Sequence, residues 1–263
     1  MSFAGQAGAD TVRTIRLMTR EDLELSAAYY PAVSTNTAAA VLLLHSLGQT
    51  KSEWDTVPVL FQRNGIAVLT FDLRGHGESN RRLTANGVET VDYRKFGPQD
   101  YKDMLLDINQ AYDWLASQPG IDKHRIAIIG SSLGSNLALR YAAYNDEVAA
   151  LILLSPTLFF QGLRTDDVIT GFGKRPLRIA VSRDDALAYE SAKYLIELRQ
   201  RAGQAVESNE LVTCSGQLRG AAMLTGVKEL SGVVFSWLEQ VLSVPPVNEP
   251  VASPKGVESD HHR

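Results

Sequence analysis

The sequence of 263 residues contains a single cysteine, Cys214, so the chain cannot form a disulfide within itself. This absence excludes a small disulfide-stapled fold and is typical of proteins from a reducing compartment. No stretch approaches the roughly 20 consecutive apolar residues that a membrane-spanning helix needs. The first residues contain neither a basic segment nor an apolar one, so we expect no signal peptide and a cytoplasmic location.

The sequence also lacks an excess of basic charge. It has 26 lysines and arginines against 30 aspartates and glutamates, a formal net charge of −4. This balance gives no electrostatic basis for binding nucleic acid or an anionic membrane. No group of histidine, cysteine and acidic residues has the spacing of metal ligands, so we expect neither a metal nor another cofactor.

Apolar runs and helical patterns alternate along most of the chain. This alternation predicts an α/β fold with a mostly parallel, twisted sheet and helices on both of its faces. Residues 11–18 and 23–30 are expected to add an antiparallel hairpin at the sheet edge. The runs typical of buried strands are residues 38–44, 66–73, 125–130, 148–154 and 177–182, with an alternating strand at 207–213. The clearest helical patterns are residues 99–117, 186–202 and 225–242.

We expect one domain over residues 11–243. Residues 1–10 are rich in glycine and alanine, and residues 244–263 hold four of the ten prolines, so both ends are predicted to be disordered. Residues 155–176 are predicted to be an irregular connection too short for a large cap over the site. The site should therefore be open to small molecules.

A Gly-x-Ser-x-Gly pattern at residues 130–134 lies between an apolar strand and a helical pattern. This order is the one that a nucleophile elbow requires. The two glycines leave room where strand and helix crowd together and tolerate strained backbone dihedrals. Ser132 is therefore predicted to expose its hydroxyl at the tip of the turn, beside backbone N–H groups of the helix that follows.

Three motifs together resemble the α/β-hydrolase fold family, particularly small bacterial carboxylesterases and dienelactone hydrolases. They read LHSLG at residues 44–48, DLRGHGES at 72–79 and GSSLG at 130–134. The resemblance implies that Ser132 is a nucleophile and that the backbone N–H groups of Leu47 and Leu133 form an oxyanion hole. Many relatives have glycine at the position of Ser46.

The resemblance also implies an acidic residue after the strand at 177–182. Two aspartates follow that strand, and the register of the family favours Asp185 over Asp184. The aspartate that does not serve as the acid is expected to cap the next helix, a common role for this residue type.

The catalytic histidine that the resemblance implies is absent from its expected loop. Arg219, just before Gly220, occupies that place, and no histidine lies between Asp185 and His261. A guanidinium stays protonated and has no lone pair to accept a proton, so Arg219 cannot act as a general base. We expect it instead to pair with Asp185.

The other histidines are weak substitutes. His45, beside the oxyanion loop, is the best internal candidate for the base. In the family the position of His76 is structural, and His124 is expected at the opposite end of the sheet. His261 and His262 belong to the tail and are expected to be solvated rather than catalytic or metal-binding.

Two classes of function follow from these residues. The first is a serine hydrolase of small esters, thioesters or lactones that forms an acyl-enzyme on Ser132, weakened or inactivated because Arg219 replaces histidine. The second is a non-catalytic binding protein in which Arg219 holds an anionic ligand, as in family members that lost the histidine and kept the pocket. A dehalogenase is disfavoured because the elbow residue is serine rather than aspartate. A haloperoxidase is also disfavoured, because the three tryptophans lie in helical patterns typical of a core.

Overall fold

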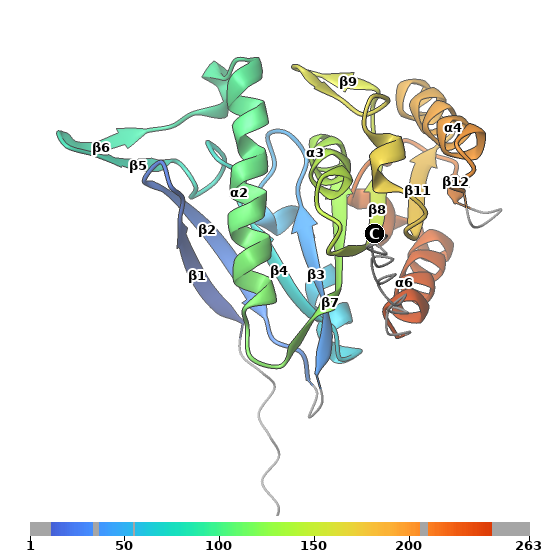
Figure 1. The fold of residues 1–263 in the computed structure, drawn as a ribbon, viewed down its shortest axis with the longest axis horizontal. Helices are drawn as coiled ribbons and strands as arrows, with labels where there is room; N and C mark the ends of the chain where they lie inside the picture. The colour runs from blue at the N-terminus through green and yellow to red at the C-terminus, as the bar shows by residue number, and fades with distance from the viewer. Residues whose placement is uncertain (1–11, 34–36, 55, 206–209, 244–263) are drawn as a thin grey trace, which may run out of the picture.

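A computed structural model describes residues 12–33, 37–54, 56–205 and 210–243 (Figure 1). The disorder predicted for residues 1–10 and 244–263 lies outside the described residues, as do residues 207–209 of one predicted strand. Within the described residues, no helix is both long and apolar enough to cross a membrane.

The centre of the fold is a mixed sheet of ten strands in the order β12-β11-β8-β7-β3-β4-β2-β5-β6, with β1 paired to β2. The pairs from β12 to β4 are parallel, whereas β2 pairs antiparallel with β4, β1 and β5. This arrangement confirms the predicted sheet and its antiparallel N-terminal portion. The strands are β1 (Arg13–Met18), β2 (Leu23–Tyr30), β3 (Ala38–Leu44), β4 (Ala67–Phe71), β5 (Arg81–Thr84), β6 (Gly87–Thr90), β7 (Ile121–Ser131), β8 (Val148–Leu154), β11 (Leu177–Ser182) and β12 (Leu211–Cys214).

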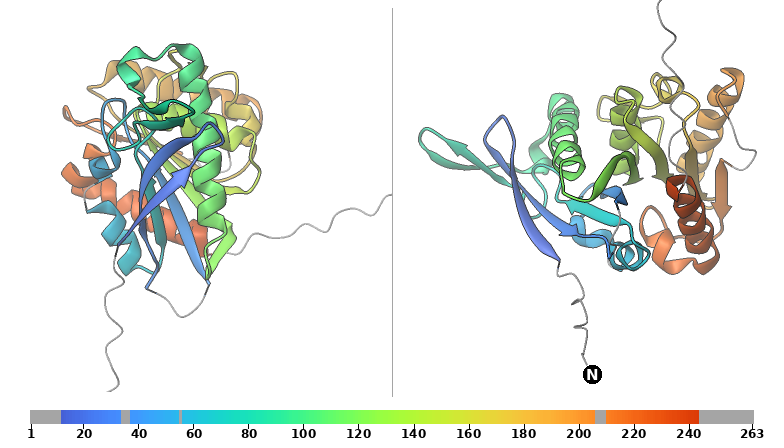
Figure 2. Two further views of the ribbon diagram at one scale, coloured as in Figure 1. Left: turned by 90° about the vertical axis from the view of Figure 1, so that its left-hand side faces the viewer. Right: turned by 60° about the horizontal axis from the view of Figure 1, so that its bottom comes forward.

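Helices cover both faces of this sheet (Figure 2). One apolar core contains side chains of α2, α3 and α4, and a second core on the other face contains those of α1, α5 and α6. The helices are α1 (Val57–Arg63), α2 (Pro98–Ala116), α3 (Leu133–Ala143), α4 (Ala186–Arg201), α5 (Ala222–Gly226) and α6 (Lys228–Ser243), with 3₁₀ helices η1 (Lys51–Trp54), η2 (Tyr93–Lys95) and η3 (Ile169–Phe172).

The strand β3 explains why the central strands read as continuous apolar runs. Its residues alternate between the two cores: Leu42 and Leu44 belong to one, and Val41 and Leu43 to the other. A strand of a parallel sheet covered on both faces needs an apolar side chain at every position. The sequence therefore shows such strands clearly, and the boundaries observed for β3, β8 and β11 match the prediction.

Three segments differ from the prediction. The hairpin of β5 and β6 was not predicted. Its turn is formed by Ala85 and Asn86, Gly87 begins β6, and the hairpin projects from the edge of the sheet (Figures 1 and 2). The pair Asn86-Gly87 is a strong hairpin signal in the sequence. The predicted last helix is divided into α5 and α6 because Val227 is extended, with φ −121° and ψ 96°. Residues 155–176 contain the two-residue strands β9 (Phe159–Phe160) and β10 (Leu163–Arg164) together with η3, and these form no large cap.

Candidate active site

The residues of the candidate site follow the carboxyl ends of five neighbouring strands. Ser46 follows β3, Ser132 follows β7, Ser155 follows β8, Asp185 follows β11 and Arg219 follows β12. All five strands are parallel, so these segments lie along one edge of the sheet. This edge is where ligands of open α/β sheets bind.

The turn between β7 and α3 has the geometry of a nucleophile elbow. Ser132 adopts φ 50° and ψ −110°, a region that costs a non-glycine residue about 1–3 kcal/mol. Its N–H donates to the carbonyl of Leu154 at 2.8 Å, which holds the turn against β8. A Cβ on Gly130 would overlap the carbonyl of Gly134, and one on Gly134 would overlap that of Leu44, so only glycine fits at both positions.

The predicted oxyanion donors follow paired strands. Leu44 of β3 and Gly130 of β7 are register partners, and Leu47 and Leu133 each come three residues later. Leu133 is the first residue of α3, and its N–H has no acceptor within the helix. The positive end of the helix dipole lies at the same point, which favours a negative charge beside Ser132.

Asp185 and Arg219 meet as the sequence predicted. Nε of Arg219 lies 3.2 Å from Oδ2 of Asp185, whose side chain is only 9% exposed. The side chain of Arg219 is 65% exposed, so the rest of the guanidinium faces solvent. Arg219 therefore extends toward the carboxylate that the family resemblance assigns as the acid.

The roles of the two neighbouring aspartates need a correction. Asp185 itself caps α4, because its Oδ1 accepts the N–H of Ala188 at 3.4 Å. Asp184 is exposed and accepts the N–H of Gly216 instead. One oxygen of Asp185 caps the helix and the other contacts Arg219, so the expectation that the cap and the partner of Arg219 are two different aspartates is wrong.

Two hydrogen bonds hold the backbone just after Arg219, one to the segment after β8 and one to the end of β7. The N–H of Gly220 donates to Oγ of Ser155 at 3.1 Å, and the N–H of Ala221 donates to Oγ of Ser131 at 2.8 Å. Gly220 has φ +55°, and a Cβ there would overlap Oγ of Ser131. The loop therefore holds the side chain at position 219 at a defined place.

His45 cannot supply the missing base, which corrects its ranking as the best internal candidate. Its Nδ1 donates to the carbonyl of Ser46 at 2.7 Å, and its Nε2 accepts the N–H of Leu73 at 2.8 Å. The ring is fully buried, and burial lowers the pKa of His45 to about 4. Both nitrogens are therefore engaged in joining the segments that follow β3 and β4.

His76 and His124 also occupy structural positions. His76 is buried, stacks on Tyr93 with ring centroids 3.9 Å apart, and has its pKa lowered by burial. His124 is exposed near the start of β7, away from the elbow at the other end of that strand. His261 and His262 lie outside the described residues.

Glu53 is a residue near the elbow that the sequence analysis missed. Its carboxylate accepts the N–H and the hydroxyl of Ser46, both at 2.7 Å, and the hydroxyl of Ser131 at 3.2 Å. No motif marks Glu53, because its contacts depend on how β3 and β7 are placed together.

In the part of the chain that the structure describes, no cluster of three potential metal ligands occurs.

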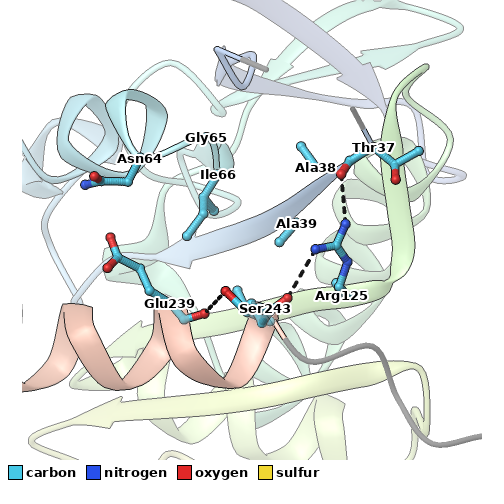
Figure 3. Close-up of a pocket in the computed structure, with 10 residues that line it drawn as sticks. Thr37, Ala38, Ala39, Asn64, Gly65, Ile66, Arg125, Glu239 and Ser243 are labelled. Atoms are coloured by element: carbon cyan, nitrogen blue, oxygen red, sulfur yellow. Dashed lines mark hydrogen bonds between the residues drawn. The ribbon is translucent and has the colours of Figure 1, made fainter. Parts of the chain in front are cut away.

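A polar pocket of about 310 Å³ lies at the opposite edge of the sheet (Figure 3). It is lined by Ala38 and Ala39 at the start of β3 and by Arg125 near the start of β7. Arg125 donates to the carbonyls of Thr37 at 2.8 Å and Leu242 at 3.3 Å, so it joins α6 to the sheet. The pocket is therefore separate from the candidate active site.

Comparison with known proteins agrees with this architecture. The profile of the alpha/beta hydrolase fold matches residues 39–172. An uncharacterised protein of Mycobacterium tuberculosis is 30% identical over 150 residues, covering 57% of this chain and 46% of that protein. A thiohydrolase of Aspergillus aculeatus is 26% identical over 151 residues, covering 56% of this chain and 42% of that enzyme. The chain thus spans less than half the length of these curated relatives.

The likeness in three dimensions extends over nearly the whole described chain. An esterase of Pyrococcus furiosus superposes with a TM-score of 0.67 at 19% identity, covering 88% of this chain and 91% of the esterase. The shared fold therefore includes the segments on both sides of the stretch that matches in sequence.

Proposed function

Because the chain belongs to the α/β-hydrolase fold family, we propose that it is a serine hydrolase of small esters, thioesters or lactones that forms an acyl-enzyme on Ser132. The observation that carries this proposal is the strained Ser132 at the N-terminus of α3. Ser132 is partly exposed, and an accessible serine hydroxyl on a strained turn at a helix N-terminus is suited to attack an acyl carbon. The similarity to a thiohydrolase and to the fold of an esterase supports the same class of reaction.

In the proposed reaction, Oγ of Ser132 attacks the acyl carbon and loses its proton. The carbonyl oxygen becomes an oxyanion and is held by the N–H groups of Leu47 and Leu133, each contributing about 2.7–4 kcal/mol in comparable enzymes. Collapse breaks the bond to the alcohol or thiol, which leaves with a proton. Water then attacks the acyl-enzyme, releases the acid and returns the proton to Ser132.

The proton transfers are the weak point of this reaction. Arg219 contacts Asp185, where a histidine would be needed to receive the proton of Ser132. Because a guanidinium stays charged, solvent must accept that proton. Loss of one member of a catalytic triad lowers the rate by several orders of magnitude, and the oxyanion hole retains part of the acceleration. We therefore propose slow turnover in the chain as it stands.

Three proteins test the proposal: the wild type, Ser132→Ala and Arg219→His. Each is assayed with p-nitrophenyl acetate and butyrate and exposed to a fluorophosphonate that labels active serines. We expect slow hydrolysis by the wild type that disappears in Ser132→Ala, and faster hydrolysis with phosphonate labelling of Ser132 in Arg219→His. Hydrolysis equal in all three proteins, without labelling, would overturn the proposal.

The ion pair between Arg219 and Asp185 favours a second function, a binding protein for small anions. Nε of Arg219 contacts the carboxylate while the side chain is 65% exposed, so the guanidinium is accessible to a carboxylate or phosphate ligand. This function predicts that short-chain carboxylates bind to the wild type and not to Arg219→Ala, as measured by calorimetry. The hydrolase alone predicts the same weak binding for both proteins.

A further inference from the structure

Four groups beside the elbow form one chain of hydrogen bonds. The N–H of Ala221 donates to Oγ of Ser131 at 2.8 Å, and Oγ of Ser131 lies 2.7 Å from Oγ of Ser46. The hydroxyl of Ser46 lies 2.7 Å from Oε1 of Glu53. Each hydroxyl has one proton to donate, and the carboxylate can only accept. The proton count is satisfied in two ways, since Oγ of Ser131 also lies 3.2 Å from Oε1 of Glu53. Ser131 donates to Ser46 and Ser46 to Glu53, or Ser46 donates to Ser131 and Ser131 to Glu53; in both, Ala221 donates to Ser131 and the network ends on the carboxylate.

The members of this chain come from three separate parts of the candidate site. Ser46 directly precedes Leu47, a predicted oxyanion donor, and Ser131 directly precedes Ser132. Ala221 lies two residues after Arg219 in the loop that follows β12. Glu53 also accepts the backbone N–H of Ser46 at 2.7 Å, so it fixes the peptide unit between His45 and Ser46, which directly precedes the unit that carries the N–H of Leu47.

The close packing around these hydroxyls shows that their arrangement is restricted. A Cβ on Gly220 would overlap Oγ of Ser131 and lie 3.3 Å from Oγ of Ser46. The backbone of the loop therefore passes directly over the two hydroxyls. Glu53 lies in η1, which is short and follows the oxyanion loop, so it can place its carboxylate beneath them.

We infer that Glu53 is a positioning residue that sets the oxyanion loop, the elbow and the loop of residue 219 relative to one another. This inference rests on the proposed function for its effect on rate. Glu53 acts through Ser46 and Ser131 and does not touch the reacting atoms. A carboxylate is suited to this task because it accepts two charge-assisted hydrogen bonds at once, which are stronger than bonds between neutral groups.

Glu53→Gln is the direct test because it preserves the shape of the side chain. In glutamine an NH2 group, which only donates, replaces one of the two oxygens, so the side chain cannot accept the N–H of Ser46 on one atom and its hydroxyl on the other as the carboxylate does. Glu197→Gln is the matched control: it makes the same change of charge on α4, where Glu197 pairs with Arg201 and is 49% exposed.

The first measurement is amide hydrogen exchange, which does not depend on catalysis. In Glu53→Gln we expect faster exchange at Ser46 and at Ala221, although Ala221 does not contact Glu53. In Ser131→Ala we expect faster exchange at Ala221, with Ser46 unchanged because its bond to Glu53 is intact. Glu197→Gln should change neither. Exchange at both amides unchanged in Glu53→Gln would overturn the inference.

The second measurement is the hydrolysis of p-nitrophenyl acetate in the Arg219→His background. We expect Glu53→Gln to lower kcat by about 10- to 100-fold with little change in KM, because small displacements of catalytic groups reduce kcat strongly. A kcat that does not change in Glu53→Gln, together with unchanged exchange at Ser46 and Ala221, would contradict the inference. If Arg219→His itself has no turnover that depends on Ser132, the proposed function fails, and hydrogen exchange still decides the role of Glu53. If Glu53→Gln does not fold, Ser46→Ala removes the shorter of the two links between Glu53 and Ser131 and should accelerate exchange at Ala221.

Discussion

Nε of Arg219 lies 3.2 Å from Oδ2 of Asp185, so a permanent cation contacts the carboxylate that would orient a catalytic histidine. The carboxylate is largely buried and the guanidinium is largely exposed. In this pair the guanidinium stands where an imidazole would be expected, and it cannot accept a proton from Ser132.

The first prediction concerns pH dependence in Arg219→His. The nearby carboxylate of Asp185 favours a charged imidazole and raises its pKa above the ordinary value of about 6.5. Because the base must be neutral, kcat for p-nitrophenyl acetate should rise as the pH passes through the raised pKa of the imidazole. At pH 8 we expect a gain of about 10²- to 10⁴-fold over the wild type, the usual contribution of general-base catalysis. Arg219→Gln removes the charge without adding a base, and an equal gain in that protein would contradict the prediction.

The second prediction concerns Gly220. Gly220→Ala introduces a Cβ that overlaps Oγ of Ser131 and also places alanine at φ +55°. Gly203→Ala is the control, because Gly203 has φ +65° and no atom within 4 Å of its Cβ position. We expect the control to lose about 1–2 kcal/mol of unfolding free energy from backbone strain alone. Gly220→Ala should lose about 1–3 kcal/mol more from the overlap. Urea denaturation measures both, and equal losses would show that the loop moves freely.

A third prediction follows from the buried imidazole of His45, whose pKa is lowered to about 4 by burial. Between pH 4 and the ordinary pKa of about 6.5, the unfolded chain binds a proton here that the folded chain does not. Protonation of His45 in the unfolded chain therefore favours unfolding as the pH falls through this window. Above the window this destabilisation disappears. We expect a loss of about 3 kcal/mol from His45 on going from pH 7 to pH 4.

The measurement compares the wild type with His45→Gln by denaturant unfolding at several pH values. Glutamine does not titrate, so the unfolding free energy of the variant should fall less steeply between pH 6.5 and pH 4. Contributions from His76 and from the carboxylates are common to both proteins and cancel in the difference. Parallel curves would mean that His45 is protonated in the folded state as readily as in the unfolded state.

The fourth prediction concerns the buried ion pair of Arg74 and Asp107. Nε and Nη2 of Arg74 donate to the two carboxylate oxygens at 2.6 and 2.7 Å, and neither side chain is more than 2% exposed. Asp107→Ala leaves the guanidinium buried with a more exposed partner, Glu21, at 3.1 Å. We expect a loss of about 3 kcal/mol of unfolding free energy, at the low end for broken buried pairs because Glu21 remains.

Glu89→Ala is the control for this pair, since Glu89 is 60% exposed and lies 3.8 Å from Arg82 on the β5–β6 hairpin. Exposed pairs contribute about 0–1 kcal/mol, so little change is expected. A loss in Asp107→Ala no larger than in Glu89→Ala would mean that the buried pair adds no net stability.

The fold could be predicted from the sequence because its signals are local. Runs such as residues 38–44 and 148–154 show strands buried on both faces, and the Gly-x-Ser-x-Gly pattern shows the elbow between a strand and a helix. The pairing of Asp185 with Arg219 was also predicted, from the resemblance to a family. The assignment of Asp185 as the acid, and of Leu47 and Leu133 as oxyanion donors, remains a prediction.

The features that were missed depend on contacts between distant parts of the chain. Glu53 and Ser131 are 78 residues apart in sequence, and nothing near either residue indicates that they meet. His45 ranked highest among the possible bases because of its position, and only its contacts with Ser46 and Leu73 show that both nitrogens are engaged. The β5–β6 hairpin did have a local signal in Asn86-Gly87, which the sequence analysis did not use.

The backbone just after residue 219 is held by hydroxyls, because Gly220 donates to Ser155 and Ala221 donates to Ser131. Neither bond involves the side chain at position 219, so both can form with another residue there. A histidine at position 219 would provide a proton acceptor, whereas the present arginine provides a permanent positive charge. We therefore expect that one substitution at position 219 changes the chemistry of the candidate site and leaves the hydrogen bonds of the loop in place.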